Sequence, residues 1–308
     1  MKENCNGCAD KSSELIWETA SKYYSDYHNV AKDFSIPVKE GLDIQKNFER
    51  LKIIEKDLKI NFQQFGNKKI LEIGCGVGSF LLAARTYNLT CYGIEPNDLG
   101  LLTCIKRDPL LKDNVFLGAG ESLPFKNQSF DLVVSFQVIE HTQNPVMVLK
   151  ESVRVLKPQG YLYFVIPNYN SFWEGHYGIF WLPQLPKRLG RIYLKFLKRD
   201  GKFLDSIQYI TPGLIEEALL TEDVKILTYG KEKFLYRLST LEFSTPAATK
   251  KLQIPVKIIK KLRISKFVGN LLCKLNMHYP LILVLQKNES PDTEDDKKSD
   301  LDNVVTET

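Results

Sequence analysis

Long apolar runs are missing from this chain of 308 residues, and so is a second pair of closely spaced cysteines. No stretch approaches the ~20 apolar residues that span a bilayer. The first twelve residues are polar, so we expect neither a transmembrane helix nor a secretory signal. The six cysteines include Cys75 and Cys91 in predicted strands, which is typical of reduced thiols in a cytoplasmic protein. Cys5 and Cys8 have no partners that would complete a zinc site, so we expect a flexible tail there.

The segment 69–80, KILEIGCGVGSF, carries the strongest signal that is present. Its apolar residues Ile70, Leu71 and Ile73 predict a buried parallel strand, and glycines at 74, 76 and 78 separate that strand from a helix near Phe80. Backbone without Cβ atoms lets a ligand approach closely, and the N–H groups of the first helical turn are unpaired. A strand, a glycine turn and a helix in this order predict a nucleotide site.

The spacing of the glycines argues against a dinucleotide. Dinucleotide sites use G-x-G-x-x-G, whose third glycine allows close helix packing beside a pyrophosphate. Here Ser79 occupies that place, and Glu72 stands just before the turn, where it would repel a pyrophosphate. We therefore expect a ligand with an amino acid end.

A second short strand, 91–94, ends at Glu95, which follows Gly74 by 21 residues. That spacing places a carboxylate where it can accept hydrogen bonds from both hydroxyls of a ribose. The alternative is that Glu95 only caps the following helix, since acidic residues are common at helix starts.

Two more strands are predicted at 132–136 and 161–167, with a helix over 145–156 between them. Glu140 and His141 stand just beyond the first of these strands. Ligands of open parallel sheets bind in the crevice at the carboxyl ends of the strands, so both side chains are expected to face it.

Taken together, these motifs resemble those of the class I S-adenosylmethionine-dependent methyltransferases of the small-molecule type, including the ubiquinone and menaquinone biosynthesis enzymes. The matching segments are LEIGCGVGSF, YGIEPN, GESLPF with SFDLV, and LKPQGYLYFVIPN, within about 66–170. The resemblance implies an α/β, Rossmann-like, seven-stranded and mostly parallel sheet with helices on both faces, to which we add helical lid insertions. It also implies S-adenosylmethionine as the cofactor.

The resemblance further implies which residues bind the cofactor. The glycine turn would hold its methionine end, the residues at the end of the second strand its ribose, and those around 120–122 its adenine, with the end of the fourth strand near the reacting methyl. The predicted cofactor-binding residues are Glu72, Gly74, Cys75, Gly76, Gly78, Glu95, Pro96, Gly120, Glu121, Ser122, Phe136 and Gln137.

Two positions depart from the family pattern. Ala119 stands where relatives often have an Asp before the Glu of the third motif. Quinone-type relatives often show Glu-x-x-Glu-His after the fourth strand, but this chain has Gln137 in place of the first Glu. Hard divalent cations favour several charged oxygen ligands, so we predict no metal.

The remaining length is arranged around this core. The expected units are an N-terminal helical cap (1–65), the cofactor-binding core (66–167), a first insertion rich in aromatic and basic residues (168–210), a core helix and sixth strand (211–230), a second, basic insertion (231–279), a seventh strand (280–287) and a disordered acidic tail (288–308). Both insertions are expected to form a lid over the substrate.

Basic and apolar residues alternate in both insertions, and no acidic residue occurs from Thr249 to Asn276. Such segments suit an anionic membrane surface or a lipid-linked phosphate, and suggest a peripheral location at the inner membrane face. The alternative is that Lys and Arg only solvate the outer face of the lid. Nucleic acid is an unlikely partner, because no nucleic-acid-binding motif appears. The oligomeric state is not indicated.

Histidine is scarce, with four in the chain, and this narrows the choice of catalytic base. His141, with Glu140 beside it, is the best placed, and His176 could enter from the first insertion with Glu174 orienting it. No Pro-Cys or Asn-Pro-Pro-Tyr-like motif follows the fourth strand, which argues against methylation of nucleic acid bases. We expect transfer to oxygen, or secondly carbon, of a small-molecule, glycan or lipid-linked acceptor. The alternatives are a catalytically silent partner subunit and a nicotinamide-dependent reductase.

Overall fold

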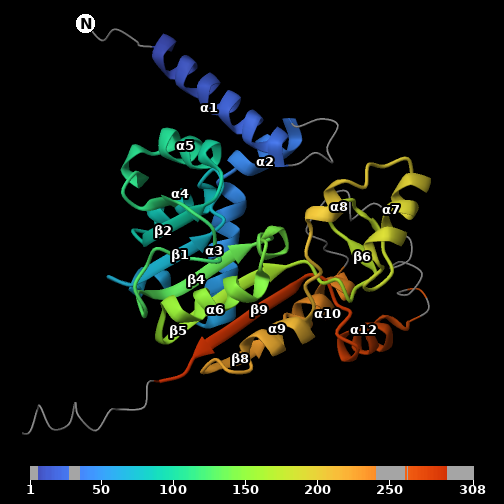
Figure 1. Cartoon of the computed structure of the whole chain (residues 1–308). Helices are drawn as coiled ribbons and strands as arrows, with labels where there is room; N and C mark the ends of the chain where they lie inside the picture. The colour runs from blue at the N-terminus through green and yellow to red at the C-terminus, as the bar shows by residue number, and fades with distance from the viewer. Residues whose placement is uncertain (1–5, 28–34, 241–260, 262, 290–308) are drawn as a thin grey trace, which may run out of the picture.

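A computed structural model describes residues 6–27, 35–240, 261 and 263–289. Its centre is a seven-stranded sheet in the order β3-β2-β1-β4-β5-β9-β8 (Figure 1). Only β9 runs antiparallel to its neighbours β5 and β8. The strands are β1 Lys69–Ile73, β2 Thr90–Glu95, β3 Val115–Leu117, β4 Phe130–Phe136, β5 Leu156–Ile166, β8 Val224–Thr228 and β9 Leu281–Lys287. The predicted Rossmann-like fold class is confirmed.

Helices cover both faces of the sheet because its central strands are apolar on both sides. In β5, Leu162 and Phe164 enter one core and Tyr163 enters the other, as the period of two along a strand requires. Helices α6 (Pro145–Val155) and α9 (Pro212–Leu219) pack on the first face, and α3 (Gln45–Leu58), α4 (Ser79–Thr86) and α5 (Asp98–Arg107) on the second (Figure 1).

Short polar side chains start three of these helices. Asn97 accepts a hydrogen bond from the Leu99 N–H (2.9 Å) before α5, and Asn144 accepts one from Met147 (3.2 Å) before α6. The predicted start at Thr211 is confirmed, because its hydroxyl accepts from the Leu214 N–H at 3.2 Å and proline follows it. These caps fix the helices at the carboxyl edge of the sheet.

The N-terminal region consists of α1 (Asn6–Tyr27), α2 (Ser35–Leu42) and α3. Helix α1 lies along α5, while α3 contributes Leu51 and Ile54 to the core under the sheet, so α3 is part of the central sandwich and not only of a cap. Cys8 lies within α1, so the expectation of a flexible tail is wrong at that residue. Cys5 lies outside the described residues.

The first insertion holds a small hairpin, β6 (Trp173–Glu174) with β7 (Ile179–Phe180), and helices α7 (Lys187–Phe196) and α8 (Phe203–Ser206). It has its own core, which includes Trp181 and Leu194. The hairpin is a correction to the purely helical insertion that the sequence suggests.

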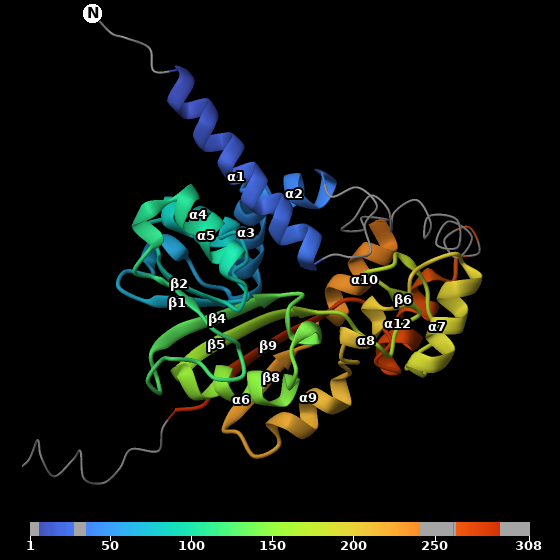
Figure 2. The same ribbon diagram turned by 45° about the horizontal axis from the view of Figure 1, so that its top comes forward.

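The second insertion contains α10 (Lys231–Thr240) and α12 (Ser265–Lys274). Its described helices lie at the same end of the molecule as α7 and α8 (Figure 2). Asn168 joins the insertions, since its side-chain amide donates to the carbonyls of Asn276 (2.8 Å) and His278 (2.7 Å). The predicted basic residues at 250–260 and the acidic tail from 290 lie outside the described residues.

None of the helices in the described part of the chain combines the length and apolar character that a membrane span requires. Cys75, Cys91, Cys104 and Cys273 are buried free thiols, as expected for those positions.

Candidate active site

The glycine turn joins β1 to α4 at the carboxyl edge of the sheet. Gly74, Gly76 and Gly78 all have positive φ, at 73°, 51° and 79°. A Cβ at Gly74 would lie 2.4 Å from the Val138 side chain, and one at Gly78 would lie 2.3 Å from Cys104 Sγ. Glycine is therefore required by both the backbone conformation and the close packing. The contact with Val138 places the turn directly beside the segment that follows β4.

Glu95 ends β2 and points back to this turn. It is 2% exposed, and its carboxylate oxygens accept hydrogen bonds from the Gly76 N–H (2.9 Å) and the Asn97 N–H (3.1 Å). Burial raises the pKa of Glu95 to about 7, against the lowering effect of these two hydrogen bonds. Each oxygen keeps a second lone pair, so a ribose diol can still bind there.

Glu72, in β1, is a second buried carboxylate beside the turn. Among the described residues its Oε2 has no hydrogen-bond partner. Burial raises the pKa of Glu72 well above its usual value, although the charge of Arg50 opposes this shift. A buried carboxylate with an unpaired oxygen fits a ligand that carries an ammonium group, as the amino acid end of the predicted cofactor does.

Two residues of the N-terminal helices approach the turn and were not singled out from the sequence. The position of a Cβ on Gly76 lies 3.2 Å from the Tyr23 hydroxyl of α1. Arg50 of α3 lies with its guanidinium carbon 4.7 Å from the ring centroid of Phe136. The only sequence signal for Arg50 is its place on the helix face beside Leu51 and Ile54, where a charge is unusual.

The other predicted cofactor residues lie at the same edge. Cys75 is buried, Pro96 is exposed after β2, and Gly120 packs near Ile73 and Val148. Glu121 Oε1 accepts hydrogen bonds from the N–H groups of Gln143 (2.8 Å) and Asn144 (3.3 Å), so this side chain fixes the segment before α6. Ser122 is exposed. Adenine binding by 120–122 stays a prediction.

The end of β4 also presents Phe136 and Gln137. Phe136 packs against Phe80 of α4, with ring centroids 5.3 Å apart. Gln137 is exposed and has φ of 56°, and its N–H donates to the Val165 carbonyl at 2.7 Å. This left-handed residue turns the chain sharply from β4 into the segment that carries Glu140 and His141.

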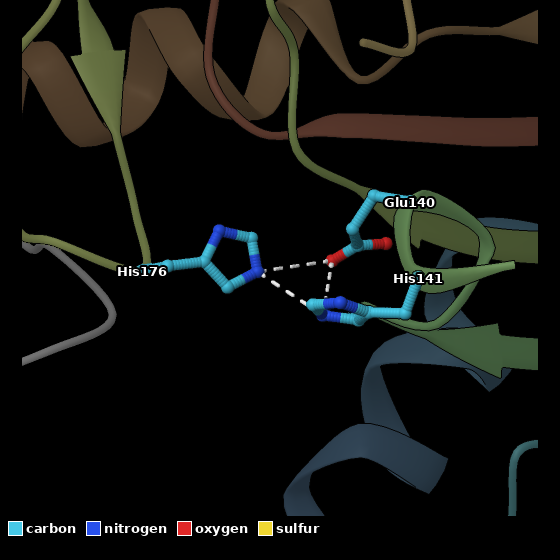
Figure 3. A group of neighbouring side chains, drawn as sticks. All are labelled: Glu140, His141 and His176. Atoms are coloured by element: carbon cyan, nitrogen blue, oxygen red, sulfur yellow. Dashed lines mark hydrogen bonds and ion pairs between the residues drawn. The ribbon is translucent and has the colours of Figure 1, made fainter. Parts of the chain in front are cut away.

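Those two residues meet His176 from the first insertion, as Figure 3 shows. Glu140 and His141 belong to a short turn of 3₁₀ helix, η3 (Ile139–His141), and His176 lies between β6 and β7. The Nε2 atoms of the two histidines are 3.2 Å apart, and Glu140 Oε1 lies 3.7 Å from that of His141 and 3.6 Å from that of His176. The three predicted catalytic residues are therefore brought together, and we call them the Glu140 cluster.

Glu174 contacts His176 on the side of the ring that does not face Glu140. Its Oε1 lies 2.7 Å from His176 Nδ1, and its Oε2 accepts a hydrogen bond from the Tyr177 N–H at 2.6 Å. Glu174 thus holds the ring of His176, as the sequence suggested.

The charges of the cluster are strongly coupled. Burial alone would lower the pKa of His176, but Glu140 and Glu174 raise it to about 10. Glu140 acts through its charge, because 3.6 Å is too long for a hydrogen bond. Burial lowers the pKa of His141, so this histidine is neutral at pH 7 and can accept a proton.

Comparison with known proteins identifies the core. Residues 71–164 match the family described as "Methyltransferase domain". The core of this chain is a class I S-adenosylmethionine-dependent methyltransferase domain. S-adenosylmethionine is the cofactor of this family. Binding of its amino acid end by the buried Glu72 and of its ribose by the buried Glu95 stays a prediction.

Individual relatives match this chain only in part. Norajmaline N-methyltransferase from Rauvolfia serpentina is 34% identical over 96 residues, which cover 30% of this chain and 33% of that protein. Phthiotriol/phenolphthiotriol dimycocerosates methyltransferase from Mycobacterium tuberculosis is 35% identical over 130 residues, or 40% and 47% of the two chains. The chain thus matches a third to a half of the length of these relatives.

A solved S-adenosylmethionine dependent methyltransferase from Mesorhizobium loti is similar with a TM-score of 0.45 and 16% identity, covering 73% of this chain and 93% of that one.

Proposed function

We propose that the protein transfers a methyl group from S-adenosylmethionine to a hydroxyl of a small-molecule, glycan or lipid-linked acceptor. The observation that carries the proposal is that two kinds of site adjoin at one edge of the sheet. The glycine turn with Glu72 and Glu95 suits the cofactor, and the Glu140 cluster begins two residues after Val138, whose side chain packs on Gly74.

The cofactor, when bound, supplies an electrophilic methyl group. The protein then has to align the acceptor, exclude water and take up the hydroxyl proton as the new bond forms. The Glu140 cluster provides a neutral imidazole in His141 and a buried carboxylate in Glu140. These groups favour an oxygen acceptor, because transfer to a hydroxyl needs a group that can receive its proton.

By the same reasoning, methyl transfer to carbon is the second candidate function, and a catalytically silent partner subunit is the third. Nitrogen also belongs in the assay, because one relative is named as an N-methyltransferase. The buried carboxylate and histidines argue against a silent subunit, since burying such groups is costly unless they bind something.

The acceptor is proposed to be reached at a membrane surface. On α7, Leu189, Ile192 and Phe196 follow one another at helical spacing and are 53%, 66% and 83% exposed. Phe267 and Leu271 of α12, with Leu275 at its C-cap, form a second exposed row. The exposed cations Arg188, Lys195, Lys266 and Lys274 flank these rows. An apolar row between cations fits the interface of an anionic bilayer.

Calorimetry with S-adenosylhomocysteine and S-adenosylmethionine tests the cofactor site. We expect both to bind and NADH not to bind. No heat at protein concentrations well above micromolar would refute the central claim, and binding of NADH alone would indicate a reductase.

Transfer itself is tested with labelled S-adenosylmethionine and pooled phenols, amines, glycans and polyprenyl-linked compounds. We expect label in hydroxylated acceptors, and a loss of about 100-fold or more in rate with His141→Asn at unchanged cofactor affinity. Exposed Glu217→Gln on α9 is the control and should not change the rate. Cofactor binding without transfer to any pool would favour the silent subunit.

A further inference from the structure

We propose that Glu140, His141 and His176 form a binding site for a divalent transition-metal cation, with Zn²⁺ as the best-fitting ion. One nitrogen from each histidine and one oxygen from Glu140 lie within 4.8 Å of one another (Figure 3). The binding claim stands apart from the proposed function, and only its catalytic consequence rests on that function.

The distances within the site match a coordination sphere. The three separations between the ligand atoms are 3.2, 3.6 and 3.7 Å. A tetrahedral Zn²⁺ with bonds of about 2.0 to 2.1 Å holds its ligand atoms about 3.3 Å apart. The three side chains therefore need to move very little to hold a cation between them.

Among the described residues, the Glu140 carboxylate has no hydrogen bond that would account for its burial. Glu140 is 0% exposed, and within the described part of the chain neither of its side-chain oxygens has a hydrogen-bond partner. Native structures seldom leave both oxygens of a buried carboxylate unpaired, because the charged group loses its hydration. A bound cation compensates for this loss.

His176, in the first insertion, has the orientation that a histidine ligand of a metal has. Its Nδ1 lies 2.7 Å from Glu174 Oε1, an acceptor, so a proton on Nδ1 leaves the Nε2 lone pair directed at Glu140 and His141. A carboxylate that bonds the second nitrogen of a histidine ligand fixes its tautomer and raises its basicity. Glu174 is accordingly a positioning residue.

The ligand set decides which cation fits. Two imidazole nitrogens and one carboxylate oxygen suit Zn²⁺ and other transition metals, whereas Mg²⁺ and Ca²⁺ favour oxygen ligands. Three protein ligands leave the fourth position open for water or an acceptor oxygen. From residues 137–141 alone, no metal is predicted. That prediction does not include His176, which lies 35 residues beyond His141 in the chain.

The site would also join the first insertion to the core. Glu140 and His141 come from η3 after β4, and His176 comes from the β6–β7 hairpin. A main-chain hydrogen bond already links the two parts here, from the Gln208 N–H to the Glu140 carbonyl. Under the proposed function, His141 as a ligand could not accept the proton of the acceptor hydroxyl. The cation would instead lower the pKa of that hydroxyl, so that its proton is lost to solvent.

The alternative to a bound cation is a proton on His176. The imidazolium would then form an ion pair with Glu140, and the site would hold no metal. Zinc binding to the full chain after chelation therefore decides between the two. The protein should carry Cys5→Ser and Cys8→Ser, because these thiols could bind zinc themselves. We expect about one equivalent of zinc by elemental analysis, and a cobalt-substituted sample with the visible absorption of a tetrahedral site.

Variants then assign the ligands. His176→Asn and Glu140→Gln should each weaken zinc binding by at least 100-fold, and Glu174→Gln by about 10- to 100-fold. Glu217→Gln, which changes an exposed side chain of α9, is the matched control and should bind zinc like the parent. No stoichiometric zinc in the parent, or unchanged binding in both ligand variants, overturns the proposal.

S-adenosylhomocysteine binding in the same samples separates the two proposals. Cofactor binding without zinc would refute the metal site alone, and zinc binding without cofactor would refute the proposed function alone.

Discussion

Single residues at the glycine turn combine burial with charge. Glu95 and Glu72 are both buried beside a turn in which Gly74, Gly76 and Gly78 carry no side chain. Water is replaced there by the N–H groups of Gly76 and Asn97 at Glu95, while Glu72 keeps one unpaired oxygen. Buried charged groups lower the stability of a protein. The two buried carboxylates at the glycine turn are therefore more consistent with a role in ligand binding than with a role in stabilising the fold.

Replacement of Glu95 by alanine is expected to weaken S-adenosylhomocysteine binding by about 1 to 3 kcal/mol, or roughly 5- to 150-fold, because two ribose hydroxyls lose a charged acceptor. Calorimetry measures the change. Asp98→Ala, three residues further on and exposed, serves as the control and should bind as the parent does. Equal affinities for the parent and Glu95→Ala would show that the ribose lies elsewhere.

The pH dependence of binding follows from the same side chain. The pKa of Glu95 is raised to about 7, so the carboxylate that accepts the ribose hydroxyls is lost as pH falls through 7. Affinity for S-adenosylhomocysteine should be constant above pH 8 and decrease by up to about tenfold per pH unit below pH 7. Glu95→Gln should bind more weakly at pH 8 but show a flatter profile. A parent profile that stays flat from pH 8 to pH 5.5 would contradict this role.

At the scale of single elements, α7 is the clearest case of a helix whose two faces differ. Gly190 and Leu194 are buried against the insertion core, and a Cβ on Gly190 would lie 2.7 Å from Trp181. The opposite side exposes Leu189, Ile192 and Phe196. The buried face of α7 therefore stabilises the fold, whereas its exposed face does not contribute to the fold.

Replacing Ile192 and Phe196 together by asparagine is expected to lower binding to vesicles of anionic phospholipid by at least about tenfold, because two exposed apolar side chains no longer enter the interface. Sedimentation at low and high salt measures this, and high salt should weaken the parent. Leu110→Asn with Leu220→Asn removes two equally exposed apolar residues elsewhere and is the control. Vesicle binding that is absent, or equal in the two double variants, would leave the row without a membrane role.

Elements with strong apolar periodicity were predictable, and those that depend on distant partners were not. The predicted strand at 91–94 is part of β2 and the one at 132–136 is part of β4, because each carries its own apolar pattern. The fifth strand begins at Leu156 rather than 161, since Leu156 pairs with Phe130 across an irregular register. The three residues of β3 gave no signal, because their strand exists only through pairing with β2.

At the scale of the whole molecule, a buried side chain at the start of the first insertion binds the end of the second insertion, 108 residues further along the chain. Asn168 is 1% exposed and donates both amide hydrogens to backbone carbonyls of the second insertion. These two hydrogen bonds also fix the segment that leads into β9, so the same side chain connects the insertions to the sheet.

Asn168→Ala is expected to lower the free energy of unfolding by about 2 to 4 kcal/mol, because a buried and a partly buried carbonyl lose their donors. Urea denaturation followed by fluorescence gives the value. Asn170→Ala, which removes only an exposed contact with Gln184, is the matched control and should cost less than about 0.5 kcal/mol. A loss no larger than that of the control would mean that the insertions are held together by other contacts.

The sequence by itself determined the glycine turn and most strands of the sheet, because these depend on local periodicity and on backbone conformations that glycine alone adopts readily. Its resemblance to a known family supplied the cofactor. The sequence also supplied Glu140, His141 and His176 as separate candidates. Only the tertiary structure decided that they meet, since His176 follows His141 by 35 residues and lies within the β6–β7 hairpin of the first insertion. Arg50 and Tyr23 were likewise placed at the turn by the packing of α3 and α1, and no local pattern encodes a contact between side chains so far apart in the chain.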